Sequence, residues 1–187
     1  MYNYPLRFKF DPENPDKDLS ILDKKNNEIL FRPRPGEQMK DGRAPVIIFT
    51  AKDRHQPVCH FTIQKQNGKA GVLINNPNDI KLGSIRRTSP REWQIFDAQD
   101  LPFGEIKEKC TLKKTWWEIL WTTSVVEDLL KLFFPHRYEV NMRGNKVLVL
   151  RESDSTLVDD YFLKKTGEFN EREEALLVAG LISILGE

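Results

Sequence analysis

The stretch Ala175-Leu-Leu-Val-Ala-Gly-Leu-Ile-Ser-Ile-Leu185 carries no charge, and it decides the fold that this sequence predicts. Asn170 is a good N-cap residue and Glu173 completes a capping box three positions later, so a helix is expected to begin here. At about 1.5 Å per residue the charge-free part spans roughly 16 Å, about half of the ~30 Å that a bilayer core requires. We therefore expect protein, rather than lipid, to surround this helix.

Large apolar side chains cover nearly the whole circumference of the predicted helix. Only a narrow stripe of small residues interrupts them, namely Ala179, Gly180 and Ser183. A helix of this kind lies inside a fold. The residues expected to hold it there are Leu176, Leu177, Val178, Leu181, Ile182, Ile184 and Leu185. Burying them at about 1.5 to 3 kcal/mol each contributes roughly 10 to 20 kcal/mol before opposing terms.

The composition is that of an ordinary globular protein. A chain of 187 residues with 39% apolar and 30% charged residues fits one domain. Its 29 basic and 28 acidic residues argue against a dedicated nucleic-acid binder. The two cysteines cannot form a disulfide framework, and Met1 is followed by a strand-like segment rather than a signal sequence, so we expect a cytoplasmic location.

Most of the chain before the last helix predicts β-strands, because apolar residues recur with period two between turn-forming residues. The expected strands are 6–10, 19–22, 28–32, 46–50, 58–64, 71–74, 81–86, 93–96, 103–109, 138–142, 146–150 and 160–164. Segments 33–45 and 64–79 are rich in Gly, Pro, Asn and charge and are expected to be largely exposed loops. A further helix is expected over 112–134, ending before Pro135.

A weak internal repetition accompanies these strands. Two apolar residues are followed, after three positions, by Asn or Asp in a predicted turn, and this occurs at Ile21-Leu22 with Asn26, Ile48-Phe49 with Asp53, Ile95-Phe96 with Asp100 and Val149-Leu150 with Asp154. Diverged structural repeats and ordinary hairpins both account for the pattern, because hairpins need such turn residues in any case.

Many short antiparallel strands and one helix without a polar face require an arrangement that covers the helix on every side. A closed barrel does this, and closure also removes exposed sheet edges. The predicted fold is therefore mainly β, a closed antiparallel barrel of roughly twelve strands around a buried hydrophobic C-terminal helix.

Several segments resemble the LURP-one-related proteins, which belong with the phospholipid scramblases in the tubby-like superfamily. The clearest are Leu82-Gly-Ser-Ile-Arg-Arg87 and Arg91-Glu-Trp-Gln-Ile-Phe-Asp-Ala98, followed by 104–109, 135–140, 144–150, 160–162 and 171–177. The resemblance covers roughly residues 80 to 187 and implies a twelve-stranded barrel around a central C-terminal helix. It transfers little chemistry, since fold alone does not choose among functions. The chain also departs from scramblases, because it has no proline-rich N-terminal tail, acylation-type cysteine cluster or acidic calcium loop.

Basic residues near the central hairpins form the first candidate site, for an anionic headgroup. They are Arg86, Arg87, Arg91, Lys107, Lys109, Lys113 and Lys114. Recognition of phosphate needs convergent donors, which arginine supplies as a fork and lysine as a point charge. On strands, Lys107 and Lys109 share a face while Arg86 and Arg87 point to opposite faces. The alternative is a solvated barrel exterior of mixed charge, because Glu105 and Glu108 lie among them.

A second candidate site is an aromatic stretch that follows Lys113 and Lys114. Trp116, Trp117 and Trp121 suit the boundary between water and lipid, where an amphipathic helix inserts its apolar face. The alternatives are a helix that caps one barrel mouth with its tryptophans packed inward, and a surface for a partner protein.

Metal and nucleophilic chemistry have little support. His55, Cys59 and His60 lie close in sequence, but adjacent strand residues face opposite sides, and zinc normally takes four ligands. We therefore expect no metal, no cofactor and no enzymatic activity. The leading expectation is a binding module for a membrane surface or an anionic phospholipid, located in the cytoplasm or peripherally at the membrane. The alternative is a protein-interaction or stress-related scaffold without a lipid role.

Overall fold

The computed structural model describes residues 1–10, 19–32, 46–53, 55–66, 69–109, 137–153 and 160–185. These residues form twelve strands and the helix α3 (Glu171–Leu185). The strands are β1 (Leu6–Phe10), β2 (Leu19–Leu22), β3 (Glu28–Arg32), β4 (Val46–Thr50), β5 (Pro57–Gln66), β6 (Lys69–Asn75), β7 (Lys81–Ser89), β8 (Glu92–Phe96), β9 (Pro102–Lys109), β10 (Arg137–Met142), β11 (Asn145–Glu152) and β12 (Asp160–Lys165).

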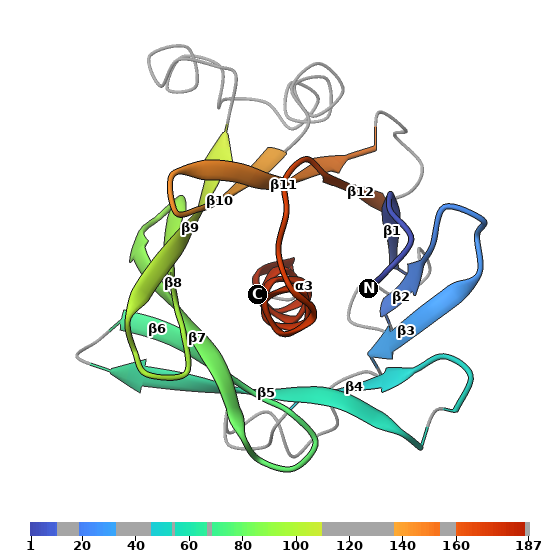
Figure 1. Ribbon diagram of the computed structural model, residues 1–187, viewed down its shortest axis with the longest axis horizontal. Coiled ribbons are helices and arrows are strands. Elements are labelled where there is room, and N and C mark those ends of the chain that lie inside the picture. The colour runs from blue at the N-terminus through green and yellow to red at the C-terminus, as the bar shows by residue number, and fades with distance from the viewer. Residues whose placement is uncertain are drawn as a thin grey trace, which may run out of the picture.

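The strands close into a barrel around α3, as predicted. Each strand pairs antiparallel with its neighbours in sequence, and β12 pairs with β1 through Leu6 opposite Leu163 and Phe8 opposite Tyr161. Figure 1 looks down this barrel and shows α3 at its centre. Since each of the twelve strands has a partner on both sides, the sheet formed by the described residues has no free edge.

The core follows the alternation of the strands. Leu6, Phe8 and Ile106 point inward and are fully buried, whereas residues between such positions face outward. The predicted inner residues of α3 meet this lining, since Leu176, Leu177, Val178, Leu181, Ile182 and Ile184 are all buried. Leu185, at the end of the helix, is only partly buried and packs against the core.

The start of α3 has the predicted capping box. The Asn170 side-chain oxygen Oδ1 accepts a hydrogen bond from the Glu173 backbone N–H at 2.9 Å, and the Asn170 N–H donates to Glu173 Oε2 at 2.9 Å. The Arg143 guanidinium donates to Glu173 Oε1 at 2.6 Å. This last contact ties the helix terminus to the turn between β10 and β11.

The small stripe on α3 has a packing role. A Cβ atom placed on Gly180 would lie 1.9 Å from Cδ1 of Ile85, a buried residue of β7. On the strand side, a Cβ on Gly83 would lie 2.3 Å from the Phe96 carbonyl oxygen and 2.7 Å from Cδ2 of Leu176. Small residues on both elements therefore allow α3 to approach β7 closely.

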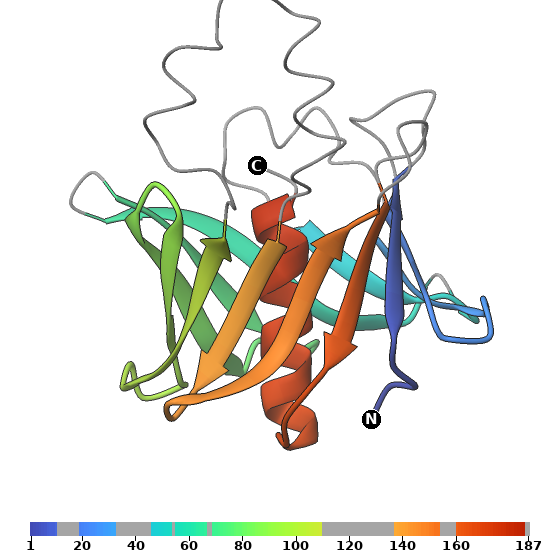
Figure 2. The same ribbon diagram turned by 90° about the horizontal axis from the view of Figure 1, so that it is seen from above.

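Successive connections alternate between the two ends of the barrel, because neighbouring strands run in opposite directions. We call the end where α3 begins the lower rim and the opposite end the upper rim. In Figure 2 the helix starts at the bottom, where β8 turns into β9 and β10 into β11, while β9 ends and β10 begins at the top. The barrel thus has two chemically distinct ends.

The lower rim repeats one turn three times. In the turns after β2, β6 and β8, an Asp or Asn side-chain oxygen accepts two backbone N–H groups at 2.8 to 2.9 Å, and these residues are Asp23, Asn76 and Asp97. Three positions on, Asn26, Asp79 and Asp100 have φ near +60°. Asn and Asp tolerate that conformation better than most residues.

The predicted repetition therefore corresponds to real turns at Asn26 and Asp100. Asp53 also lies in a turn, but there its carboxylate accepts the His55 N–H at 3.0 Å and its φ is not positive. Asp154 lies outside the described residues. The sequence pattern did not reveal the equivalent turn at Asp79, because a polar residue, Asn75, occupies the position of the second apolar residue.

The prediction of a loop over 64–79 was wrong. Most of segment 64–79 belongs to β5 and β6, which pair from His60 opposite Asn75 to Gln66 opposite Lys69. The apolar alternation from Gly71 to Ile74 indicated only the middle of this pairing, because the polar residues around it weaken the pattern. The expected loop 33–45 and the expected helix over 112–134 lie outside the described residues.

Candidate anion-binding surface

The predicted basic residues do not form one cluster. Arg86 lies on the outer face, where its Nη2 donates to Asp100 Oδ1 at 2.5 Å and its guanidinium lies 4.2 Å from the centre of the Phe96 ring. Lys81 Nζ also donates to Asp100, at 2.6 Å. Hydrogen bonding from Lys81, followed by the charges of Lys81 and Arg86, lowers the pKa of the Asp100 carboxyl group. Arg86 is therefore already paired with a carboxylate and an aromatic ring of the barrel itself.

Arg87 points to the opposite face of β7, as the alternation predicted. Its Nη2 donates to the Pro90 carbonyl at 2.7 Å, and its guanidinium lies 5.6 Å from the Trp93 ring centre. Lys107 Nζ lies 2.8 Å from Glu105 Oε1, and this hydrogen bond is the main reason why the pKa of Glu105 is lowered. Arg86, Arg87 and Lys107 thus have separate protein partners.

Near the upper rim, three cations lie side by side on the outer face. Lys109 of β9 is opposite Arg137 of β10, and Arg137 is opposite Arg151 of β11. All three are exposed, and alternation from the buried Ile106, Val140 and Leu150 points them outward. We call Lys109, Arg137 and Arg151 the cationic row.

The cationic row carries an electrostatic cost, because like charges directly opposite each other on neighbouring strands are destabilising. One carboxylate offsets part of this cost. Glu139 Oε1 lies 2.9 Å from Arg137 Nη2 and 2.7 Å from Lys146 Nζ. The pKa of Glu139 is lowered by Lys146 first, and then by the charges of Arg137 and Lys109. Glu139 is therefore shared between Arg137 and Lys146.

An exposed aromatic residue extends the cationic row toward β1. Phe162 of β12 is opposite Arg151, and it is 41% exposed. Arg7, its neighbour on β1, lies 5.8 Å above the Phe162 ring and donates from Nε to Asp160 Oδ2 at 2.7 Å. At the other end, the Arg91 carbonyl accepts the Glu108 N–H at 2.9 Å, which places exposed Arg91 beside the end of β9.

Sequence reasoning found Lys109 and Arg91 but missed Arg137 and Arg151. Both arginines stand one residue outside the strands expected at 138–142 and 146–150. The turn at Arg143 and Gly144, with φ of 50° and 82°, could have indicated them. This turn sets the register of the hairpin, and that register places Arg137 opposite Arg151. Lys113, Lys114, Trp116, Trp117 and Trp121 lie outside the described residues, in the segment that connects Lys109 to Arg137.

The described His and Cys residues, His55, Cys59 and His60, do not assemble a reactive site. Cys59 points into the core and is 2% exposed, and burial raises the pKa of its thiol to about 12. His60 faces outward, with Nε2 3.0 Å from Asp79 Oδ1, so the predicted opposite orientation is confirmed. Within the described ranges, no group of three or more His, Cys, Asp and Glu residues could hold a metal ion.

Comparison with known proteins supports the architecture. No protein-family model matches the chain, and no curated protein sequence matches it. A crystal structure of a protein from Arabidopsis thaliana is similar over 98% of this chain and 91% of that chain, with a TM-score of 0.52 and 11% sequence identity. This likeness shows a shared fold.

Among the described residues, no helix has the length and apolarity needed to cross a bilayer.

Proposed function

We propose that this barrel is a non-enzymatic module that binds anionic phospholipid headgroups at the cytoplasmic surface of a membrane, and that it is related to the LURP-one-related proteins of the tubby-like superfamily. The single observation that supports this function is the cationic row. Three aligned cations have an electrostatic cost in the free protein, and an anion placed against them relieves it. Two of the three are arginines, which bind phosphate oxygens in a bidentate manner.

The surroundings of the cationic row also suit a membrane surface. Phe162 presents an exposed ring beside the cations, and aromatic side chains are favourable at the level of the headgroups. Arg91 adds a further exposed cation at the same rim. In this proposal the tryptophans Trp116, Trp117 and Trp121, with Lys113 and Lys114, extend the contact, because their segment leaves and rejoins the barrel at the cationic row.

Liposome co-sedimentation tests the proposal. Each Lys or Arg near an anionic surface contributes about 1 kcal/mol, so the variant Lys109→Gln/Arg137→Gln/Arg151→Gln should bind phosphatidylserine-containing vesicles roughly 100-fold more weakly. Binding of the unaltered protein should fall as salt is raised. The matched control is Lys24→Gln/Lys25→Gln/Lys52→Gln, which removes the same charge from exposed positions at the lower rim.

Failure of the unaltered protein to sediment with anionic vesicles would refute this function. An equal loss in both triple variants would show that only net charge matters. A second variant replaces Lys113, Lys114, Trp116 and Trp117, and unchanged binding there would remove this segment from the contact.

A protein-interaction or stress-related scaffold is the second candidate function, and one observation favours it. Ile80 and Leu101 are 58% and 61% exposed at the ends of two turns of the lower rim. The hydrogen bond between Lys81 and Asp100 joins these turns. Affinity capture of one stoichiometric protein partner that is lost in Ile80→Ser/Leu101→Ser, together with no binding to anionic vesicles, would support the scaffold instead.

A further inference from the structure

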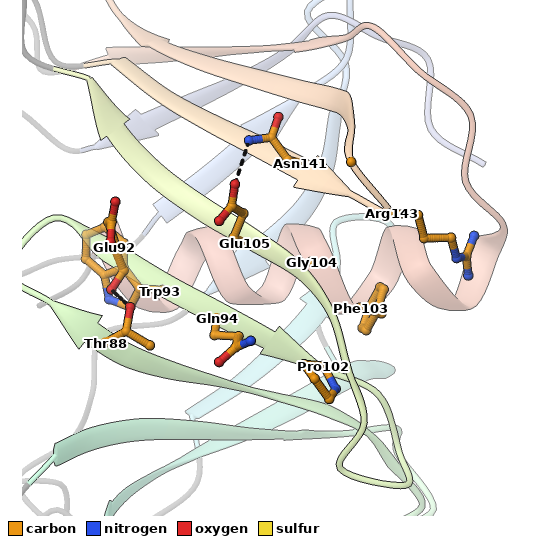
Figure 3. A pocket seen from close by; sticks show the side chains of 11 residues that line it. Thr88, Glu92, Trp93, Gln94, Pro102, Phe103, Gly104, Glu105, Asn141 and Arg143 are labelled. Atoms are coloured by element: carbon orange, nitrogen blue, oxygen red, sulfur yellow. Dashed lines mark hydrogen bonds between the residues drawn. The ribbon is translucent and has the colours of Figure 1, made fainter.

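A polar groove runs across the outer face of β8, β9 and β10, apart from the cationic row. Its volume is about 770 Å³, within the range of roughly 300 to 1,000 Å³ that is common for small-molecule sites. Figure 3 shows Gln94, Glu105 and Asn141 along it, with Pro102 and Phe103 toward one end. Along β9, Lys109 lies four positions after Glu105, which is roughly 13 Å at about 3.3 Å per residue.

The floor of the groove is a row of three hydrogen-bonding side chains from three strands. Gln94 is opposite Glu105, and Glu105 is opposite Asn141. Asn141 Nδ2 donates to Glu105 Oε1 at 3.2 Å, which leaves its carbonyl oxygen and its second N–H available for a ligand. The Gln94 carboxamide forms no hydrogen bond with any described residue. The row thus presents donors and acceptors at neighbouring positions.

The charges of the groove select against an anion. Glu105 stays ionised, because the Lys107 hydrogen bond, with a smaller contribution from Asn141, lowers its pKa. Exposed Glu92 adds a second carboxylate at the end away from Phe103. Arg143 also lines the groove, but its guanidinium is held by Glu173 at 2.6 Å, so the groove offers phosphate no unpaired cation and exposes it to the Glu92 carboxylate. A cation gains little from Glu105, because the Lys107 ammonium group already lies 2.8 Å from it.

The apolar end of the groove completes the pattern. Pro102 is exposed and the Phe103 ring is partly exposed beside the polar row. A ligand that suits both parts has hydroxyl groups, which donate and accept hydrogen bonds, and an uncharged C–H face that packs against an aromatic ring. We infer that this groove binds a neutral saccharide. The inference is independent of the proposed membrane function, because the two sites share no residue.

Nuclear magnetic resonance on the ¹⁵N-labelled full chain tests this inference directly, since the side-chain amide groups of Gln94 and Asn141 give their own signals. Maltose and lactose should cause saturable shifts of those signals at millimolar concentrations, the affinity that suits an open site. Gln94→Ala/Asn141→Ala should weaken binding at least tenfold, as followed by the backbone N–H signals of residues 103–105. The matched control is Gln64→Ala, an exposed carboxamide on β5 outside the groove.

A second titration series keeps one sugar ring and changes its charge, with glucose, glucosamine and glucose 6-phosphate. Glucose should bind at least as tightly as either charged sugar. The inference is overturned if neither disaccharide gives saturable shifts in the groove. It is also overturned if binding survives the double variant unchanged, or if glucosamine or glucose 6-phosphate binds more tightly than glucose. The backbone spectrum of the double variant verifies that the barrel is folded.

Discussion

Replacing Gly83 with alanine should destabilise the barrel through a clash at its interior. Gly83 lies within β7, and an added Cβ would lie 2.3 Å from the Phe96 carbonyl oxygen and 2.7 Å from Leu176 Cδ2. Leu176 can rotate, but the carbonyl belongs to the backbone of β8. The substitution therefore requires β7 and β8 to separate locally.

The size of the effect follows from two opposing terms. Overpacking a core costs about 1 to 3 kcal/mol, and the backbone contact favours the upper half of this range. Replacing glycine by alanine within a strand recovers about 0.5 to 1 kcal/mol of conformational entropy. The net loss is then about 1 to 2.5 kcal/mol. At about 2 to 4 °C per kcal/mol for a chain of this size, Tm should fall by roughly 2 to 10 °C.

Thermal unfolding followed by circular dichroism measures this change, and Gly71→Ala is the matched control. Gly71 lies in the adjacent strand β6, but its Cβ would have only ordinary contacts, the nearest at 3.4 Å from the Ile85 carbonyl oxygen. Gly71→Ala should therefore raise stability by about 0.5 to 1 kcal/mol. Equal Tm values for Gly83→Ala and the unaltered protein would refute the close packing of β7 against β8 and α3.

Three further predictions concern the helix and a turn. Leu181→Ala should lower the free energy of unfolding in urea by about 2 to 5 kcal/mol, because Leu181 is fully buried, and a loss below about 1 kcal/mol would contradict this. Truncation after Glu174 should abolish the cooperative melt, since roughly 10 to 20 kcal/mol of burial exceeds a net stability of about 5 to 15 kcal/mol. Backbone N–H groups, first that of Asn27, lower the pKa of Asp23, so its contribution is complete above the usual carboxyl pKa and is lost as pH falls through the lowered value. Asp23→Asn should therefore lose less stability than the unaltered protein between pH 7 and acid pH in urea titrations, and identical acid losses would contradict the assignment.

The architecture was predictable because burial alone dictates it. A helix with Leu176, Leu181 and Ile182 on different sides has to be surrounded, and antiparallel strands can surround it only by closing. The capping box at Asn170 and Glu173 was predictable for a related reason, since it depends on residues three apart in the chain. Properties that depend on local spacing and burial were therefore within reach of sequence reasoning.

The candidate sites were less accessible, because they depend on register between strands. Lys109, Arg137 and Arg151 become neighbours only through two strand pairings, one of which spans a long connection. The β10–β11 pairing also contains a register shift between Val140 and Asn141, which simple alternation does not reveal. The groove at Gln94 has the same origin, since its side chains come from three strands. The cationic row and the groove therefore depend on nonlocal strand pairing and irregular register, which the sequence alone does not reveal.

The closure between β1 and β12 has a consequence for how the chain folds. All the other strand pairs join sequence neighbours, and most of them can form as local hairpins at a small loop-closure cost, although the connection between β9 and β10 is longer. The seam between β1 and β12 joins distant parts of the chain. The helix α3, which fills the interior, follows β12 closely in sequence. During synthesis, the strands therefore emerge as an open sheet whose apolar inner face stays uncovered until the last segment arrives. Seam closure should limit the folding rate, and the open sheet is the species most prone to aggregate.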